Sequence, residues 1–274
     1  MSTRVHPSAV IDAGARIGAN VVIGPFCSIG REVELCDGVE LTSHVVVAGR
    51  TRIGPRTQVF PFASIGAPAQ DLKARGDEGR LLVGADCIIR EGVTVNAGTI
   101  AGGVETHVGD HCALLAYSHV AHDCRLGEGV VLSNNVLLGG HVEIGDHVMI
   151  GGASAVHQHT RIGAHAFIAG LAGVEGDVPP FALAGGNRAH LFGLNLVGLR
   201  RRGFSAERIA RLKNAFRILF SRGEEFDARS LAERVESLAA HHEGDPDLRI
   251  LVDFLRAPSN RPLCAPRAGK AQAP

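Results

Sequence analysis

A six-residue repeat runs through residues 11–65, which read IDAGARIGANVVIGPFCSIGREVELCDGVELTSHVVVAGRTRIGPRTQVFPFASI. An aliphatic residue stands at every sixth position of this stretch, from Ile11 to Ile65, without a miss. The period resumes at Val83 for three hexads, shifts by one residue, and then runs from Val108 to Val174. Three hexads make a triangular coil of about 18 residues whose aliphatic side chains stack inside, with coils ~4.8 Å apart. The repeat therefore predicts a parallel β-helix.

Small or β-branched residues occupy a second position in almost every hexad, two places before the aliphatic residue. Four of the six cysteines lie at this position: Cys27, Cys87, Cys112 and Cys124. We interpret these cysteines as small packing residues and expect no metal site among them. Single cysteines without a C-x-x-C pair favour a reducing compartment, and no run of about 18 apolar residues is present. The sequence thus predicts a cytoplasmic protein without membrane insertion.

The overall composition excludes some functions. Lys plus Arg and Asp plus Glu both number 28, so the formal charge is zero and no global field attracts nucleic acid or anionic lipid. Aromatic residues make up only 4% and glycine reaches 35 residues, which is typical of a narrow aliphatic core with many tight turns. We expect no nucleic-acid partner.

Breaks in the period divide the chain. We predict a left-handed β-helix over 1–180, a projecting loop over 66–82 and a shorter excursion over 98–105, with the handedness taken from known hexapeptide proteins. A C-terminal helical region is predicted over 181–257, and a Pro/Arg/Ala-rich tail over 258–274 is predicted to be disordered.

Capping signals mark the predicted helices. Ser205 can cap a helix that stops near Gly223, and a second amphipathic stretch covers about 228–242. Asp245 followed by proline predicts a last helix that ends before Pro258. Such short helices need a partner surface, so we expect them to pack on the prism or on neighbouring subunits.

Histidines gather in the later coils at His119, His122, His141, His157 and His159. The 18 residues from His141 to His159 equal one coil, so these two side chains should stack. Three interpretations remain open from the residues: a zinc site like that of hexapeptide carbonic anhydrases, a solvated polar face, or general-base catalysis by His122 with Asp123 orienting its ring.

Eight motifs are more specific than the hexads: FPFASIG at 60–66, QDLK at 70–73, HVAHDC at 119–124, GGH at 139–141, AVHQ at 155–158, DVPP at 177–180, GN at 186–187 and GLNLVGLRRRGFS at 193–205. Together they resemble the acyl-ACP:UDP-N-acetylglucosamine O-acyltransferases over about residues 4–256. The resemblance implies transfer of an (R)-3-hydroxyacyl group from acyl carrier protein to the glucosamine 3-hydroxyl of UDP-N-acetylglucosamine, the first step of lipid A biosynthesis. It also implies a homotrimer with sites between subunits, without cofactor or metal.

The resemblance also implies roles for individual residues. His122 matches the general base, Asp123 its orienting partner and the Gly140 N–H the oxyanion donor. The positions that match substrate contacts are Gln70, Asp71, Lys73, His119, His141, His157, Gln158, Asn195, Arg201 and Arg202, and those that match the acyl-chain end are Gly170, Leu171 and Arg188. A stretch rich in Lys and Arg at 188–222 suits diphosphate and the acidic carrier protein.

Three positions depart from the family pattern. Asn96 stands where histidine is common, Val197 where a glutamate lies near the uridine, and Arg188 where a histidine is associated with the acyl-chain end. These departures leave room for a 3-amino sugar acceptor.

Three competing functions share the hexapeptide fold. They are the later N-acyltransferase of the pathway, which bears an additional N-terminal uridine-binding domain, a hexapeptide carbonic anhydrase, and a non-enzymatic scaffold.

Overall fold

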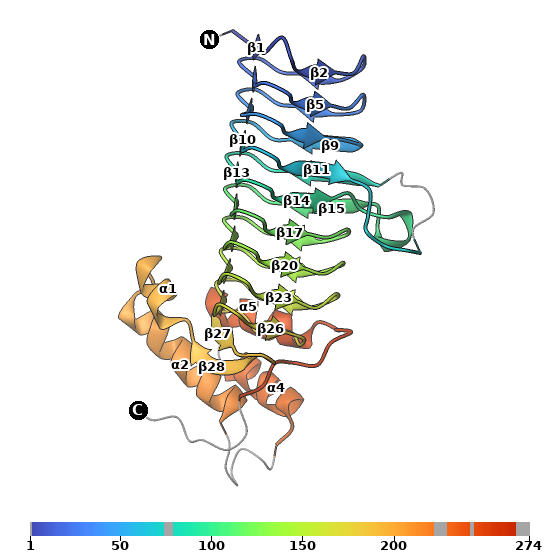
Figure 1. Cartoon of the computed structure of the whole chain (residues 1–274). Coiled ribbons are helices and arrows are strands. Elements are labelled where there is room, and N and C mark those ends of the chain that lie inside the picture. The colour runs from blue at the N-terminus through green and yellow to red at the C-terminus, as the bar shows by residue number, and fades with distance from the viewer. Residues whose placement is uncertain (1, 74–78, 222–228, 242–243, 267–274) are drawn as a thin grey trace.

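The chain folds as a three-sided prism with helices at one end (Figure 1). The structure is a computed structural model of the whole chain and describes residues 2–73, 79–221, 229–241 and 244–266. Each side of the prism is one sheet of short parallel strands, which we name sheets A, B and C. The predicted β-helix is confirmed.

The strands follow one another around the prism in the order A, B, C. Sheet A contains β1 (Arg4–Val5), β4 (Val22–Ile23), β7 (Glu40–Leu41), β10 (Gln58–Val59), β13 (Ile88–Ile89), β16 (Ala113–Leu114), β19 (Val131–Leu132), β22 (Met149–Ile150), β25 (Phe167–Ile168), β27 (Ala182–Gly185) and β28 (His190–Leu194). Sheet B contains β2 (Val10–Ile11), β5 (Ser28–Ile29), β8 (Val46–Val47), β11 (Ser64–Ala67), β14 (Thr94–Asn96), β17 (His119–Val120), β20 (Leu137–Leu138), β23 (Ala155–Val156) and β26 (Gly173–Val174). Sheet C contains β3 (Arg16–Ile17), β6 (Glu34–Leu35), β9 (Arg50–Ile53), β12 (Arg80–Val83), β15 (Glu105–Val108), β18 (Arg125–Leu126), β21 (Glu143–Ile144) and β24 (Arg161–Ile162).

The hexad period sets the register between coils. Val120 pairs with Leu138 and Leu138 with Val156, each 18 residues further on. In the two-residue strands of the middle coils the first side chain points outward and the second inward, so Leu132 is fully buried beside a partly exposed Val131. Burying each such aliphatic side chain contributes about 1.5–3 kcal/mol, and the repeat multiplies this along the whole prism.

The cysteines at the small-residue position lie in this core. Cys27, Cys87, Cys112 and Cys124 are at most 1% exposed and none forms a disulfide. Their thiols point at backbone carbonyls of the turns, as when Cys124 Sγ donates to the Gly139 carbonyl at 3.1 Å. Their interpretation as packing residues agrees with this burial.

The connections from sheet B to sheet C form one long edge of the prism, which we call the B–C edge. On successive coils it is built from the described ends of the loop 68–79, the turn around the 3-10 helix η1 (Ile100–Gly102), and the two-residue turns at 122–123, 140–141 and 158–159. Both predicted breaks in the period therefore fall on the same edge, and strands β11 and β12 shorten the first of them from the predicted 66–82.

The C-terminal region begins with a hairpin before its helices. Strands β27 and β28 pair antiparallel and extend sheet A within the region that the sequence predicts to be helical. The helices are α1 (Leu196–Arg201), α2 (Ala206–Phe220), α4 (Leu231–His241) and α5 (Pro246–Arg256). Ser205 and Asp245 cap α2 and α5 as predicted. Among the described residues, no helix combines the length and the apolar character needed to cross a membrane.

The predicted disorder of the tail is wrong for its first half. Residues 258–266, which we call the strap, return along the end of the prism, where Asp177 N–H donates to the Pro262 carbonyl and Cys264 N–H to the Asp177 carbonyl. Cys264 is only 6% exposed. A proline-rich segment can be ordered in this way because backbone hydrogen bonds to a fixed surface replace internal structure; residues 267–274 lie outside the described part of the chain.

Candidate active site

An imidazole and a carboxylate meet in the turn that joins β17 to β18. His122 Nδ1 lies 2.8 Å from Asp123 Oδ2, and their side chains are 13% and 1% exposed. An ionised carboxylate only accepts hydrogen bonds, so it holds the imidazole proton at Nδ1 and leaves the lone pair of Nε2 available. The predicted pair thus has the geometry of a general base with its orienting group.

Thr99 holds the buried Asp123 carboxylate. Its N–H donates to Oδ1 at 2.9 Å and its hydroxyl to Oδ2 at 2.7 Å. The Asp123 N–H in turn donates to Thr106 Oγ1 at 2.8 Å. A buried carboxylate is tolerated when charge-assisted hydrogen bonds replace water, and Thr99 supplies two of them, while Thr106 holds the Asp123 backbone.

The excursion around η1 lies directly over this pair. A Cβ added to Gly102 would overlap the Asp123 carboxylate and lie 2.6 Å from His141 Cε1, so only glycine fits. Thr99 and Gly102 were not identified from the sequence as site residues. The break in the hexad period over 98–105 could have indicated them, because an insertion into a regular prism projects from one particular edge and can cover a site there.

Gly140 follows on the next coil, against the His122 ring. An added Cβ there would lie 2.7 Å from both Cε1 and Nε2 of His122. No described group accepts a hydrogen bond from the Gly140 N–H. An N–H donor close to the ring of the base could stabilise the oxyanion that forms on a carbonyl oxygen when a nucleophile deprotonated by Nε2 attacks that carbonyl.

Further histidines extend the site along the B–C edge. His141 contacts His122 edge-on at 5.1 Å between ring centroids and stacks on His159 at 4.4 Å, which confirms the predicted stacking. Burial lowers the pKa of His141, the neighbouring His159 and His122 lower it further, and the Asp123 and Asp71 carboxylates oppose them. His119 lies on β17 with Nδ1 2.7 Å from Thr94 Oγ1, and burial followed by the neighbouring His122 lowers its pKa.

The projecting loop brings its predicted residues to this edge. Asp71 lies close enough to affect the pKa of His141, and its Oδ1 accepts the Lys73 N–H at 2.9 Å. Gln70 and Lys73 are exposed beside it. Asn96, the first departure from the family pattern, is buried and donates to the Pro68 carbonyl at 2.8 Å, so it anchors the start of the loop.

The coil after Gly140 bears His157 and Gln158. Gln158 N would lie 2.8 Å from a Cβ on Gly139, so this turn packs directly against the one before it. Arg261 of the strap donates through Nε to the Gln158 carbonyl at 2.8 Å, and its Nη2 contacts His157 Nδ1. Arg261 was missed from the sequence because it lies in the tail predicted to be disordered.

The predicted nucleotide residues lie apart from the His122 group within one chain. Asn195 caps α1 by accepting the Gly198 N–H at 3.1 Å, and its amide nitrogen donates to the His165 carbonyl at 3.0 Å. Arg201 and Arg202 are exposed at the end of α1, on the opposite side of the prism from the projecting loop in Figure 1.

The residues assigned to the acyl-chain end come later in the chain than the histidines, and Gly170 and Leu171 lie on the edge between sheets A and B. Gly170 and Leu171 form the turn between β25 and β26, where Leu171 is 76% exposed. Arg188, another departure from the family pattern, forms an ion pair with Glu175. Val197, which also departs from that pattern, is 58% exposed on α1 and offers a nucleotide only apolar surface.

Ligand atoms of His122, Asp123 and His141 all lie within 4.8 Å of one another, so these three could hold a metal ion. His122 Nδ1 faces Asp123 in the pair described above, and its use as a metal ligand would break that hydrogen bond. A metal and the general-base geometry therefore compete for the same atoms.

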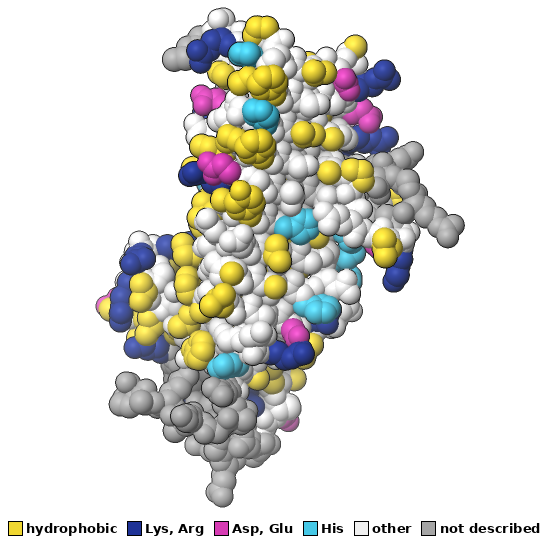
Figure 2. Space-filling view, viewed as in Figure 1, with side chains coloured by type: hydrophobic (Ala, Val, Ile, Leu, Met, Phe, Trp, Pro, Cys, Tyr) yellow, Lys and Arg dark blue, Asp and Glu magenta, His cyan; other side chains and the backbone are white. Residues whose placement is uncertain are grey.

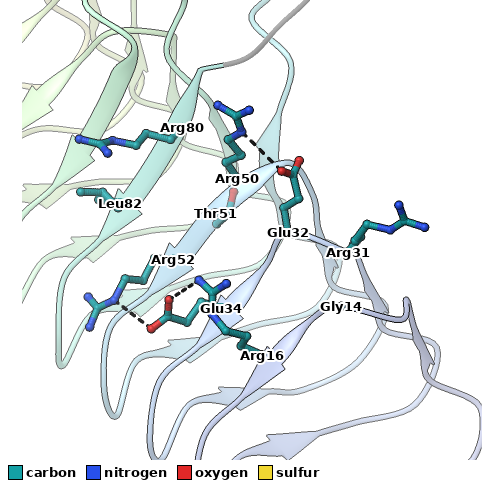
Figure 3. Close-up of a pocket in the computed structure, with 10 residues that line it drawn as sticks. All are labelled: Gly14, Arg16, Arg31, Glu32, Glu34, Arg50, Thr51, Arg52, Arg80 and Leu82. Atoms are coloured by element: carbon teal, nitrogen blue, oxygen red, sulfur yellow. Dashed lines mark hydrogen bonds and ion pairs between the residues drawn. The ribbon is translucent and has the colours of Figure 1, made fainter.

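A hollow of about 470 Å³ lies on the outer face of sheet C, away from the B–C edge histidines (Figure 3). Its arginines are largely paired: Glu34 lies between Arg16 and Arg52, at 2.7 and 3.4 Å, and Glu32 lies 3.5 Å from Arg50. The hollow is lined by alternating basic and acidic side chains on a solvated face, and none of the described histidines lines it.

Comparison with known proteins agrees with this geometry. Residues 177–264 match the family described as Udp N-acetylglucosamine O-acyltransferase, domain 2, and residues 14–49 and 105–140 match bacterial transferase hexapeptide repeats. The solved UDP-N-acetylglucosamine O-acyltransferase of Moraxella catarrhalis is 37% identical and superposes with a TM-score of 0.91 over 95% of this chain and 99% of its own. The fold is therefore a left-handed parallel β-helix with a C-terminal helical region.

Curated relatives span almost the whole chain. The acyl-[acyl-carrier-protein]–UDP-N-acetylglucosamine O-acyltransferase of Rhizobium johnstonii is 45% identical over 269 residues, which is 98% of this chain and 97% of the relative. The enzyme of the same name from Sinorhizobium fredii is 48% identical over 268 residues, with the same coverage. The chain therefore belongs to the family of acyl-[acyl-carrier-protein]–UDP-N-acetylglucosamine O-acyltransferases.

Proposed function

We propose that this protein transfers an (R)-3-hydroxyacyl group from acyl carrier protein to the 3-hydroxyl of UDP-N-acetylglucosamine, the first step of lipid A biosynthesis. The observation that supports it best is the His122–Asp123 pair with the Gly140 backbone packed against the His122 ring. A sugar hydroxyl is a poor nucleophile near neutral pH, so it needs a base that is already oriented. The names of the relatives supply the two substrates.

In this mechanism His122 Nε2 removes the proton from the sugar 3-hydroxyl as its oxygen attacks the thioester carbonyl. The Gly140 N–H stabilises the negative charge on the carbonyl oxygen of the tetrahedral intermediate. When the intermediate collapses, the C–S bond breaks and the imidazolium returns its proton to the departing thiol of the carrier. Asp123 stabilises the imidazolium between these two steps. No acyl-enzyme forms.

The remaining residues bind the two substrates. On the B–C edge we assign the loop residues Gln70, Asp71 and Lys73 and the neighbouring His119, His141, His157 and Gln158 to this role. We assign Asn195, Arg201 and Arg202 to the nucleotide, and Gly170, Leu171 and Arg188 to the far end of the acyl chain. Arginine forks match the geometry of a diphosphate, and the acidic carrier protein suits the same basic region.

We further propose that three copies of the chain assemble with the sites between them. Exposed apolar side chains gather on sheets A and B and on the edge between them, where Phe26, His44 and Phe62 form a stack with 5.0 Å between successive centroids. In Figure 2 they follow the left and centre of the prism, while charged residues cluster at its upper right. Self-association through sheets A and B buries the apolar surface and leaves the charged sheet C in water.

Assembly would also bring α1 of one subunit to the histidines of another. Within one chain the arginines of α1 and the His122 group do not meet, yet the proposed reaction needs the nucleotide and the base at one sugar. A mixture of two inactive variants, His122→Ala and Arg201→Ala, should regain part of the activity after joint refolding if sites lie between subunits. Absence of any regained activity in mixed trimers would contradict the shared site.

We also propose that the reaction takes place in the cytoplasm, because single free cysteines suit a reducing compartment. The product has one acyl chain, and a single chain gives only marginal and reversible membrane binding. We therefore expect the enzyme in the supernatant after cell lysis at moderate salt. Recovery of most of the protein with washed membranes would contradict this expectation.

The central test compares wild type with His122→Ala on a series of 3-hydroxyacyl-ACP donors. Loss of the base should lower kcat by about 10²–10⁴, and the donor series also measures chain-length preference. His111→Ala is the matched control, because His111 is an exposed histidine in a turn of the same prism and should leave turnover unchanged. Equal turnover of wild type and His122→Ala would refute the base.

Two further measurements separate this function from the competing ones. Turnover only with the 3-amino analogue of the sugar nucleotide would mean that the acceptor group is an amine and not a hydroxyl, with His122 still the proposed base. Zinc at one per chain that is required for activity would contradict the general-base mechanism and favour a carbonic anhydrase-like site at His122, Asp123 and His141. A scaffold without catalysis predicts no turnover at all.

A further inference from the structure

The strap brings an arginine to the B–C edge from the far end of the sequence. Arg261 lies 103 residues beyond Gln158, donates through Nε to its carbonyl at 2.8 Å and contacts His157 Nδ1 through Nη2. His157 and Gln158 lie on the coil that follows the turn at 140–141 beside His122. The strap therefore contacts the last of the three turns of the candidate site on the B–C edge.

The contact has a definite chemical consequence for His157. His157 Nδ1 lies near two groups, Arg261 Nη2 and, at 3.3 Å, the Gln158 carbonyl. A guanidinium has only donors, and Arg261 Nε already donates to that carbonyl at 2.8 Å, so in the contact with Arg261 the ring nitrogen acts as an acceptor. The proton of a neutral His157 then resides on Nε2, and the ring presents an N–H donor away from the strap. The simultaneous bond to the Gln158 carbonyl fixes the guanidinium, and with it the position of the ring.

We propose that Arg261 is a positioning residue that holds His157 as an Nε2–H donor toward an oxygen of the bound sugar nucleotide. The proposal rests on the proposed function for the identity of that ligand. It adds a specific task for the strap, which would otherwise be a surface segment. The oxygen-rich sugar nucleotide offers hydroxyl, carbonyl and phosphate acceptors, all of which match a fixed N–H.

Deleting the Arg261 side chain should leave the strap in place. The strap is fixed by backbone bonds between Asp177 and Pro262 and between Asp177 and Cys264, and by burial of the Cys264 side chain. Arg261→Ala removes none of these. The variant consequently tests the side chain separately from the segment, and an unchanged melting temperature verifies this.

Carbethoxylation followed by mass spectrometry tests the contact without any need for turnover. The reagent attacks the unprotonated ring nitrogen, which for His157 is the Nδ1 covered by Arg261. His157 should react several-fold faster in Arg261→Ala than in wild type. The carbethoxylation rate of His147, which lies nearby in the sequence, serves as the internal reference. The matched control is Arg256→Ala, since Arg256 pairs with Glu236 on the helices. Equal reactivity of His157 in Arg261→Ala and wild type would overturn the proposal.

Steady-state kinetics test the role in catalysis. Arg261→Ala should raise KM for UDP-N-acetylglucosamine about tenfold, the loss expected for one weakened hydrogen bond, while kcat stays within about twofold. Arg261→Lys should recover part of the loss, because lysine still donates to His157. In a double-mutant cycle with His157→Ala the two effects should not add, since Arg261 acts through His157.

The outcomes distinguish this inference from the proposed function. An active wild type with an unaffected Arg261→Ala would overturn the positioning role and leave the acyltransferase in place. Additive effects of the two substitutions would also overturn it, because they would mean that Arg261 does not act through His157. A wild type inactive with every acceptor would contradict the function, and the labelling experiment would still decide whether Arg261 sets the state of His157.

Discussion

A methyl group added at Gly140 should disable the proposed base while leaving every proposed donor in place. In Gly140→Ala the new Cβ would lie 2.7 Å from Cε1 and Nε2 of His122 and 3.3 Å from Nδ1. Carbon atoms pack at about 3.5–4.0 Å, so the imidazole must move by about 1 Å. A displacement of that size at a reacting group lowers turnover by about 10². The oxyanion N–H remains, so the loss reports the position of His122 alone.

The assay compares kcat/KM and thermal unfolding of Gly140→Ala with those of Gly30→Ala. An added Cβ at Gly30 has its nearest neighbours at 3.5 Å, an ordinary contact, and Gly30 lies in the early coils far from His122. Neither glycine has a left-handed φ, so alanine imposes no backbone strain at either position. We expect both variants to fold and only Gly140→Ala to lose activity. Wild-type kcat/KM in a folded Gly140→Ala would refute the assignment of His122 Nε2 as the reacting atom.

Three other predictions concern stability and thiol chemistry. Burial lowers the pKa of His165, which stacks on Phe181, to about 4, so the folded state binds fewer protons than the unfolded chain below pH 6.5. Stability should therefore decline by an amount on the order of 2 kcal/mol as the pH falls from 6.5 toward 4, and a pH series of urea denaturation should show a smaller decline for His165→Phe. Leu132→Ala, at a fully buried position, should lower the free energy of unfolding by about 2–5 kcal/mol in the same assay. Cys36 is the least buried cysteine and burial raises its pKa, so a thiol reagent should modify native protein slowly at one site, and Cys36→Ser should abolish that reaction.

The prism could be predicted from sequence because one local rule repeats. An aliphatic residue at every sixth position determines which side chain points inward, and pairing 18 residues apart follows without any information from distant segments. The stacking of His141 on His159 follows from the same rule. The caps at Ser205 and Asp245 are equally local, because each side chain bonds backbone N–H groups two or three residues away.

Contacts between segments far apart in the sequence could not be predicted in this way. Thr99 reaches Asp123 across 24 residues, and Arg261 reaches Gln158 across 103. Composition alone assigned the strap to a disordered tail, since Pro, Arg and Ala do not signal a core. Its order depends on free backbone groups near Asp177, which become visible only once the last coil is built.

The candidate site lies where the repeat is interrupted by an insertion or carries polar turn residues, and the geometry of the prism explains this location. Backbone groups of the parallel strands hydrogen-bond to the neighbouring coils, so most groups of the candidate site lie on the B–C edge, where turn residues are free of the ladder, and His119 on β17 is an exception. Coils at a spacing of about 4.8 Å place the turns 122–123, 140–141 and 158–159 within contact distance of one another at a single corner. Adding η1 to the same corner covers the buried carboxylate without disturbing the core. Deletion of one whole coil on the N-terminal side of these turns should therefore shorten the prism yet leave the His122–Asp123 geometry intact. Deletion of a single hexad between the turns 122–123 and 140–141 would instead move the later turn to another edge and separate the base from its oxyanion donor.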